Sequence, residues 1–131
     1  MKPYWSGVFP AITTQMRRDG SIDLEATARH AERLIESGVT GLIFLGSLGE
    51  NQALTPHEKR QVVEAMVKAV NGRVAVLSGV AESSVQEASR YLQDGEKLGL
   101  DGFMLMPSML YKGDTRRRCS RNWPTLRTSW L

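Results

Sequence analysis

Short, predominantly apolar runs alternate with longer amphipathic stretches, and this alternation limits the fold more than any other feature of the sequence. The apolar runs span residues 7–14, 41–45, 73–80 and 101–107. Strands that are apolar throughout are covered on both faces, as in a parallel sheet whose strands are joined by right-handed helical crossovers. The sequence therefore predicts the order β-α-β-α-β-α-β, built around a parallel sheet.

The stretches between these runs carry helix signals. The second stretch is the clearest, because Thr55 is predicted as the N-cap, Pro56 as the first helical residue and Glu58 as the third residue of a capping box. Asp23 is predicted to cap the first helix, and Gly38 to follow its end. A third helix is predicted to be capped by Ser83 or Ser84 and to close near Gly99. The first helix is predicted to bury an apolar stripe of Leu24, Ala28, Ala31, Leu34 and Ile35. The second is predicted to bury a stripe of Val62, Val63, Met66, Val67 and Val70.

Two architectures share this order, an open doubly wound sheet and a (β/α)₈ barrel, and both place ligands beyond the carboxyl ends of the strands. The second apolar run ends in such a position with the sequence GSLGE, residues 46–50. A dinucleotide fingerprint would need a glycine where Phe44 stands, and a P-loop would need a Lys-Ser/Thr pair after the second glycine. Nothing local resembles the His-Asp-Ser set of a hydrolase. The loop is therefore a candidate binding site of another kind, or only a turn.

The composition is that of an ordinary globular protein, with 41% hydrophobic and 24% charged residues. We find no signal-like N-terminal region and no apolar run near the roughly 20 residues that cross a bilayer, so no membrane partner is expected. Cys119 is the one cysteine and can form no internal disulfide, so a reducing cytoplasm is expected. Without companion cysteines or spaced histidines, no metal site is expected.

The balance of basic and acidic residues changes near residue 116. Residues 1–115 hold 12 Lys/Arg and 14 Asp/Glu, whereas residues 116–131 hold five arginines and no acid. The tail also lacks an apolar period, so we divide the chain into a folded body, residues 1–115, and an aberrant basic tail, residues 116–131, that is out of frame or disordered. The alternative is a binding tail whose arginines, with Trp123 and Trp130, hold single-stranded nucleic acid. A nucleic-acid partner is not the expected one, because the tail has no folded platform.

The body resembles a known family. The segments GVFPAITT, DGSID, GVTGLIFLGSLGENQALTPHEKRQVV, GRVAVLSGV and GLDGFMLMPSMLYK occur in the order and spacing of the dihydrodipicolinate synthase/N-acetylneuraminate lyase family, over roughly residues 5–113. The resemblance implies an α/β fold, the (β/α)₈ TIM barrel. It also implies a lyase or synthase that acts on pyruvate or another 2-keto acid through a Schiff base with a lysine on strand six, and that needs no cofactor.

By the same resemblance, the loop at residues 46–50 cradles the carboxylate of the keto acid. Gly46 and Gly49 let the backbone come close, and Ser47 stands at the first hydroxyl position of the motif. Leu48 stands where the lysine-biosynthetic branch usually carries a second threonine. This departure favours a relative with another aldehyde partner, or a dehydratase. Glu50 is expected to brace the loop rather than to take part in chemistry.

Three further positions are candidates from neighbouring strand ends. Thr14 either points into the barrel mouth or serves as a capping hydroxyl. Gly79 either gives backbone room beside a bound ligand or serves only the turn. Tyr111 follows the fourth run, where family members carry a proton-relaying tyrosine, but the motif places that tyrosine at Leu110, one residue earlier.

The imine-forming lysine has no counterpart in the chain. A full barrel needs about 250 residues, so the chain is expected to form a truncated half-barrel of about four βα units and to be catalytically inactive. Lys112 is in the wrong place, and Lys59, Lys68 and Lys97 are expected on the exposed side of outer helices, where an amine is not tuned for nucleophilic attack. The histidines His30 and His57 are expected on the surface. A half-barrel would expose sheet edges, which favours self-association or a partner chain.

Overall fold

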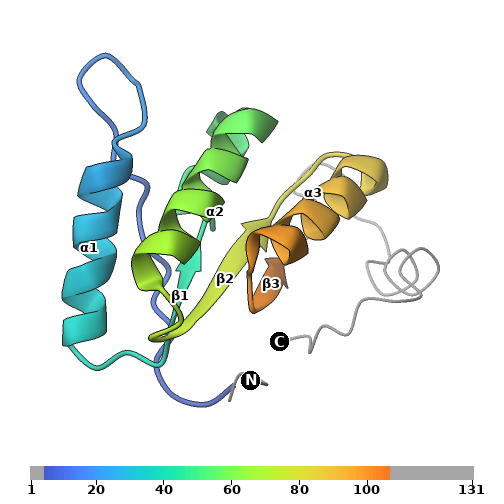
Figure 1. Cartoon of the computed structure of the whole chain (residues 1–131). Coiled ribbons are helices and arrows are strands. Elements are labelled where there is room, and N and C mark those ends of the chain that lie inside the picture. The colour runs from blue at the N-terminus through green and yellow to red at the C-terminus, as the bar shows by residue number, and fades with distance from the viewer. Residues whose placement is uncertain (1–4, 107–131) are drawn as a thin grey trace.

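The computed structural model describes residues 5–106 of the 131-residue chain. This part contains three α-helices, three β-strands and one short 3₁₀ helix (Figure 1). In chain order they are α1 (Leu24–Glu36), β1 (Gly41–Phe44), η1 (Asn51–Ala53), α2 (Pro56–Val70), β2 (Ala75–Val80), α3 (Val85–Leu98) and β3 (Gly102–Leu105).

The described strands form one parallel sheet in the sequential order β1-β2-β3. All three helices lie on the same side of this sheet (Figure 1). A doubly wound sheet reverses its strand order and places helices on both faces, whereas a barrel keeps one direction and places every helix outside. The arrangement is therefore an open portion of a TIM barrel, in which the described strands do not close. The expected self-association through open edges stays a prediction.

The first apolar run does not form a strand, contrary to the prediction. Residues 7–14 lie extended beside β1, but only Ala11 and Ile43 form a bridge there, in the parallel sense. The Ile43 amide donates to the Pro10 carbonyl at 3.0 Å, and the Ile12 amide donates to the Ile43 carbonyl at 3.0 Å. Pro10 has no amide hydrogen of its own, which keeps the ladder short. The segment thus occupies the place of a first barrel strand without a strand's continuous hydrogen bonding.

The predicted helix ends are confirmed by their hydrogen bonds. Asp23 accepts from the Ala26 amide at 2.9 Å and caps α1. Thr55 and Glu58 form the complete capping box of α2, with Thr55 Oγ1 accepting from the Glu58 amide at 3.3 Å and Glu58 Oε2 accepting from the Thr55 amide at 2.8 Å. Of the two serines proposed for α3, Ser84 is the cap.

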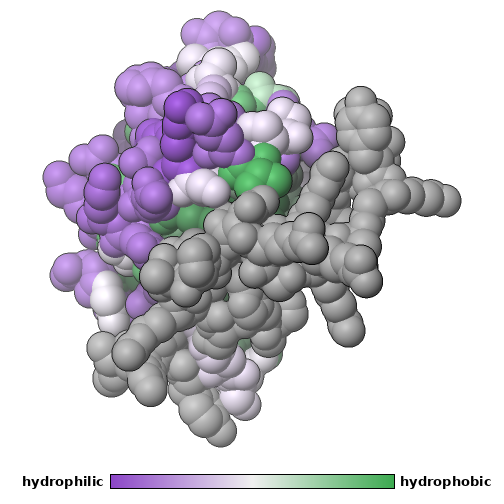
Figure 2. All heavy atoms as spheres, turned by 90° about the vertical axis from the view of Figure 1, so that its right-hand side faces the viewer, coloured by the Kyte–Doolittle hydropathy of each residue, from purple (hydrophilic) through white to green (hydrophobic). Residues whose placement is uncertain are grey.

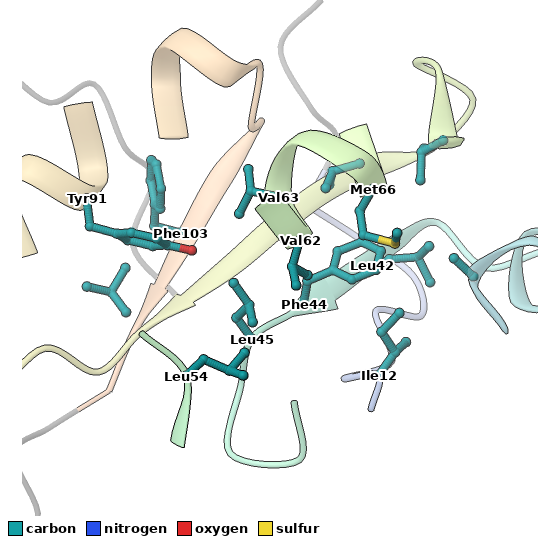
Figure 3. Packing of buried hydrophobic residues seen from close by; sticks show 14 of the residues in the cluster. Ile12, Leu42, Phe44, Leu45, Leu54, Val62, Val63, Met66, Tyr91 and Phe103 are labelled. Atoms are coloured by element: carbon teal, nitrogen blue, oxygen red, sulfur yellow. The ribbon is translucent and has the colours of Figure 1, made fainter. Parts of the chain in front are cut away.

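The hydrophobic core lies between the helices and one face of the sheet (Figure 3). Strand residues alternate between the two faces, so Leu42 and Phe44 of β1 point toward α2 and meet its buried stripe. The predicted stripes of α1 and α2 all belong to this core or pack against it. Hydrophilic side chains predominate on the outer side of the helices, at the left of Figure 2. The fully buried members with large side chains are Leu42, Phe44, Leu45, Val62, Val63, Met66, Val70 and Val80.

Truncation of Met66 should destabilise the fold strongly, because its side chain is fully buried where α2 packs on the sheet. We expect Met66→Ala to lower the free energy of unfolding by about 2–5 kcal/mol, through lost apolar contacts and the cavity left behind. Lys68→Ala, on the exposed side of the same helix, is the matched control and should change it by at most about 0.5 kcal/mol. Urea unfolding followed by circular dichroism measures both, and equal losses would contradict the assigned core.

Candidate functional site

Most of the residues proposed from the sequence meet at the carboxyl ends of β1 and β2. The segment at residues 46–50, called the 46–50 loop below, leaves β1 through Leu45, whose φ of 52° is left-handed. The Gly49 amide donates to the Gly46 carbonyl at 3.0 Å, and the Glu50 amide donates to the Ser47 carbonyl at 3.2 Å. These bonds fold the loop into consecutive tight turns. The proposed residues brought together here are Thr14, Gly46, Ser47, Leu48, Gly49, Glu50 and Gly79.

The tip of the loop presents unpaired hydrogen-bond donors. Within residues 5–106, the amides of Ser47 and Leu48 have no hydrogen-bond partner, and both residues are exposed. The Ser47 hydroxyl lies 3.5 Å from the Met106 sulfur, a weak acceptor, so it remains available to a stronger one. Leu48 is 63% exposed, so the tip carries an apolar side chain beside its donors. The arrangement suits an anionic ligand.

Thr14 anchors the loop from the extended segment beside β1. Its side chain is buried, and Oγ1 donates to the Gly49 carbonyl at 2.8 Å. This contact uses the hydroxyl hydrogen of Thr14 to hold the loop, and the two roles predicted for Thr14 from the sequence stay predictions. The neighbouring Thr13 is exposed and accepts a hydrogen bond from Gln15.

The glycines at 49 and 79 are needed because backbones approach closely there. A Cβ at Gly49 would lie 2.8 Å from the Leu45 amide nitrogen, and a Cβ at Gly79 would lie 2.2 Å from the Leu45 carbonyl oxygen. The space beside Gly79 is thus filled by the backbone of Leu45. Neither Gly46 nor Gly49 has a positive φ; the left-handed residues are Leu45 and Glu50.

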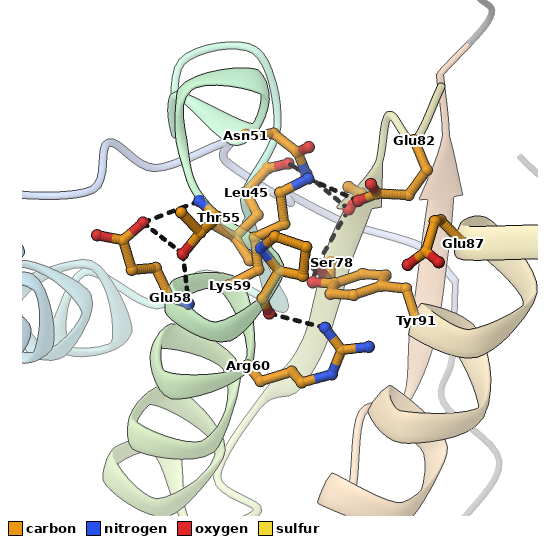
Figure 4. Close-up of polar contacts among 12 residues, drawn as sticks. Leu45, Asn51, Thr55, Glu58, Lys59, Arg60, Ser78, Glu82, Glu87 and Tyr91 are labelled. Carbon is orange, nitrogen blue, oxygen red and sulfur yellow. Dashed lines mark hydrogen bonds and ion pairs between the residues drawn. The ribbon is translucent and has the colours of Figure 1, made fainter. Parts of the chain in front are cut away.

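Asn51 was not identified from the sequence, yet it links the two strand ends. Its side chain is 1% exposed, and Nδ2 donates to the Leu45 carbonyl at 2.8 Å and to the Gly79 carbonyl at 3.1 Å (Figure 4). Asn51 Oδ1 has no partner among the described residues. The only sequence signal was a polar residue directly after the loop, which is common in turns.

Behind Asn51, Ser78 of β2 and Tyr91 of α3 form a buried hydroxyl pair. Ser78 Oγ lies 2.6 Å from the Tyr91 hydroxyl and 3.2 Å from the Gly79 carbonyl. Burial raises the pKa of Tyr91 to about 12, because the charged phenolate would lose its hydration, although the hydrogen bond with Ser78 acts in the opposite direction. Arg60 lies over the Tyr91 ring, 6.0 Å from its centroid, and pairs with Asp94.

Glu50 contributes to the loop through its backbone. Its left-handed backbone begins η1, and its carbonyl accepts from the Ala53 amide at 2.9 Å. The carboxylate itself is exposed and accepts no hydrogen bond from the described residues. A pocket of 260 Å³ opens beside it, lined by Ser47, Glu50, Asn51, Gln52, Ala53 and Met106.

The prediction that Lys59 is an exposed helix lysine is wrong. Its side chain is 5% exposed, and Nζ lies 2.6 Å from the Glu82 carboxylate, which follows β2. The first turn of α2 lies against the strand ends, so its inner side is buried and the charged amine needs a partner there. Lys68 and Lys97 are exposed, as predicted.

The two histidines differ from each other. His57 is exposed as predicted, whereas His30 is half-buried in α1. Tyr111 and Lys112 lie outside the described residues, as does the basic tail. Within the described part, no group of three or more His, Cys, Asp or Glu side chains is arranged to hold a metal ion, and no helix is long and apolar enough to cross a membrane.

Comparison with known proteins confirms the resemblance given by the sequence motifs. The sequence model described as the dihydrodipicolinate synthetase family matches residues 4–120. A 4-hydroxy-tetrahydrodipicolinate synthase of Methanococcus maripaludis is 42% identical over 100 residues, covering 76% of this chain and 34% of the relative. An uncharacterized DapA-like lyase of Halobacterium salinarum is 35% identical over 108 residues, covering 82% of this chain and 36% of the relative.

The solved structures show the same architecture. The crystal structure of YagE, a prophage protein of the dihydrodipicolinic acid synthase family from E. coli K12 in complex with pyruvate, matches with a TM-score of 0.88 at 27% identity. The match covers 96% of this chain and 43% of YagE. The chain thus spans about a third of the length of the two curated relatives and under half of this solved structure.

Removing one partner of the buried ion pair should destabilise the fold more than removing both. We expect Lys59→Met to lower the free energy of unfolding by about 3–5 kcal/mol, because Glu82 would be left with a mostly buried, uncompensated charge. The double variant Lys59→Met/Glu82→Gln should recover most of this loss, since no charge then remains unpaired. Urea unfolding of the three variants, Glu82→Gln included, measures the coupling, and additive losses would contradict a buried pair.

Proposed function

The chain belongs to the dihydrodipicolinate synthetase family, and on that premise we propose that its 46–50 loop binds the carboxylate of a pyruvate-like 2-keto acid. The observation that carries this proposal is the pair of unpaired amides at Ser47 and Leu48. Consecutive backbone N–H groups form a concave site for an anion, and the Ser47 hydroxyl adds a third donor.

The surroundings of the loop support this assignment. Thr14 and Asn51 restrain the loop through the Gly49 and Leu45 carbonyls, so the donors are held in place before a ligand arrives. The adjoining 260 Å³ pocket can admit a small molecule. YagE, which shares the architecture, was crystallised in complex with pyruvate.

The reaction of the intact enzyme would proceed through an imine. A neutral lysine amine attacks the keto carbon and water leaves, which makes the adjacent carbon acidic enough for carbon–carbon or carbon–oxygen bond changes. Of the lysines in the described part, Lys59 is paired with Glu82, and Lys68 and Lys97 are exposed on outer helices. We therefore assign to residues 5–106 the carboxylate-binding portion of a class I lyase or synthase site, and no imine-forming lysine within that part of the chain.

Leu48 bears on the second substrate. Its side chain is exposed at the tip of the loop, where it offers apolar surface in place of a hydroxyl. The Ser47 hydroxyl then has no neighbouring hydroxyl on the loop with which to relay a proton. We propose that the intact protein uses an aldehyde other than that of the lysine-biosynthetic synthase, or acts as a dehydratase.

Pyruvate should shift the amide resonances of the loop. We expect titration of the ¹⁵N-labelled chain to move the Ser47 and Leu48 signals, because their N–H groups would bind the carboxylate. Ser47→Ala should raise the dissociation constant about tenfold, the loss expected for a hydrogen bond to a charged group. Ser83→Ala, an exposed serine after β2, is the control and should leave it unchanged. Pyruvate shifts that avoid the loop would refute the assigned site.

The chain should form no covalent adduct with pyruvate. Borohydride reduces an imine to a stable secondary amine, so an imine-forming lysine would gain the mass of a reduced pyruvyl group. We expect the mass of the chain to stay unchanged after incubation with pyruvate and borohydride, with an intact enzyme of the family as positive control. A single modified lysine, located by peptide mapping, would show that the chain supplies its own nucleophile.

A further inference from the structure

A continuous line of buried hydrogen bonds connects helix α3 to the base of the 46–50 loop (Figure 4). It runs from the Tyr91 hydroxyl to Ser78 Oγ, then to the Gly79 carbonyl, which Asn51 Nδ2 also contacts, and from Asn51 to the Leu45 carbonyl. We infer that Asn51, Ser78 and Tyr91 are positioning residues for the keto-acid carboxylate, acting through the backbone of Leu45. This inference rests on the proposed function of the loop.

The direction of each hydrogen bond follows from counting hydrogens. Ser78 has one hydroxyl hydrogen, and its contact with the Gly79 carbonyl, which can only accept, uses it. Either hydroxyl can donate across the 2.6 Å contact, and we assign the donor as Tyr91 because the Ser78 hydrogen is used by the Gly79 carbonyl. Asn51 Nδ2 has two hydrogens, which match the carbonyls of Gly79 and Leu45. Every donor in the line is used once, so loss of one group leaves its neighbour unsatisfied.

Leu45 is the residue that needs such support. It is a buried, left-handed leucine with a φ of 52°, a conformation that leucine rarely adopts. Its carbonyl is fixed by Asn51 and packs against Gly79, where no side chain would fit. The orientation of this peptide sets the direction in which the chain enters Gly46, and therefore where the amides of Ser47 and Leu48 lie.

If a substitution removed one of these hydrogen-bonding groups, water could not easily take its place, because the line is buried. Asn51, Ser78 and Tyr91 are 1%, 0% and 3% exposed. The Tyr91 hydroxyl is protonated at neutral pH, as in any tyrosine, and its raised pKa of about 12 leaves this unchanged, so it carries a hydrogen to donate. Tyr91 is also held by α3 and by Arg60, which places the outer end of the line on a packed helix rather than on a loop.

The deciding variant is Tyr91→Phe, because it removes one oxygen atom that touches neither the loop nor its ligand. We expect it to raise the pyruvate dissociation constant about threefold to tenfold and to speed amide hydrogen exchange at Gly49 and Glu50, whose amides close the turns of the loop. Ser78→Ala should act similarly, and Tyr91→Phe/Ser78→Ala should be no worse than the stronger single variant. Thr40→Val is the matched control, since it removes a hydroxyl contact with the Val8 amide at the other end of β1.

The outcomes separate this inference from the proposed function. If Tyr91→Phe and Thr40→Val lower global stability alike but neither changes pyruvate affinity or loop exchange, the line is only structural and the inference fails. Additive effects of the Tyr91 and Ser78 changes on affinity would also overturn it. If the wild-type chain binds no pyruvate, the proposed function fails, and faster exchange at Gly49 and Glu50 in Tyr91→Phe alone still supports the positioning line.

Discussion

The structure around the candidate site depends on one constraint, the reversal of the chain at Leu45 inside the protein. A buried carbonyl must find a hydrogen-bond donor, and the Leu45 carbonyl has left the sheet ladder at a left-handed bend. Asn51 supplies the donor, and Gly79 leaves the space into which the carbonyl projects. The turns of the 46–50 loop, the exposed amides at its tip and the burial of Asn51 all follow from the way this bend is accommodated.

Much of the fold follows from local signals in the sequence. The capping box at Thr55 and Glu58 and the cap at Asp23 are interactions between near neighbours, so they can be recognised without knowledge of the rest of the chain. The continuous apolar runs are also local features, and they predicted the parallel sheet. Residues 7–14 were the exception, because Pro10 interrupts the ladder although the run is apolar enough for a strand. The parallel sheet alone is compatible with both a doubly wound sheet and a barrel. These differ in strand order and in the faces of the sheet that the helices cover, which local signals do not specify.

The candidate site was predictable where it depends on chain order and not where it depends on contacts. The strand-end rule located the 46–50 loop, and the family motif singled out Ser47 within it. Asn51 and Lys59 were missed because their roles come from Gly79, 28 positions after Asn51, and Glu82, 23 positions after Lys59, or from backbone carbonyl groups that carry no sequence signal. Lys59 shows the difference clearly: a lysine in the first turn of a helix is usually exposed, but here α2 begins against Glu82, and the pair is buried.

The polar groups behind the loop serve different ends. Lys59 and Glu82 connect the start of α2 to the segment after β2. Each neutralises the charge of the other, so neither charge is buried without a partner. Asn51, Ser78 and Tyr91 carry no charge, and their geometry is directional, so they determine where a backbone carbonyl points. An anion at the tip of the loop depends on such directional restraint, because amide donors attract it only along their N–H bonds. Under the proposed function, carboxylate binding is a property of this part of the barrel that does not require the lysine that completes the chemistry.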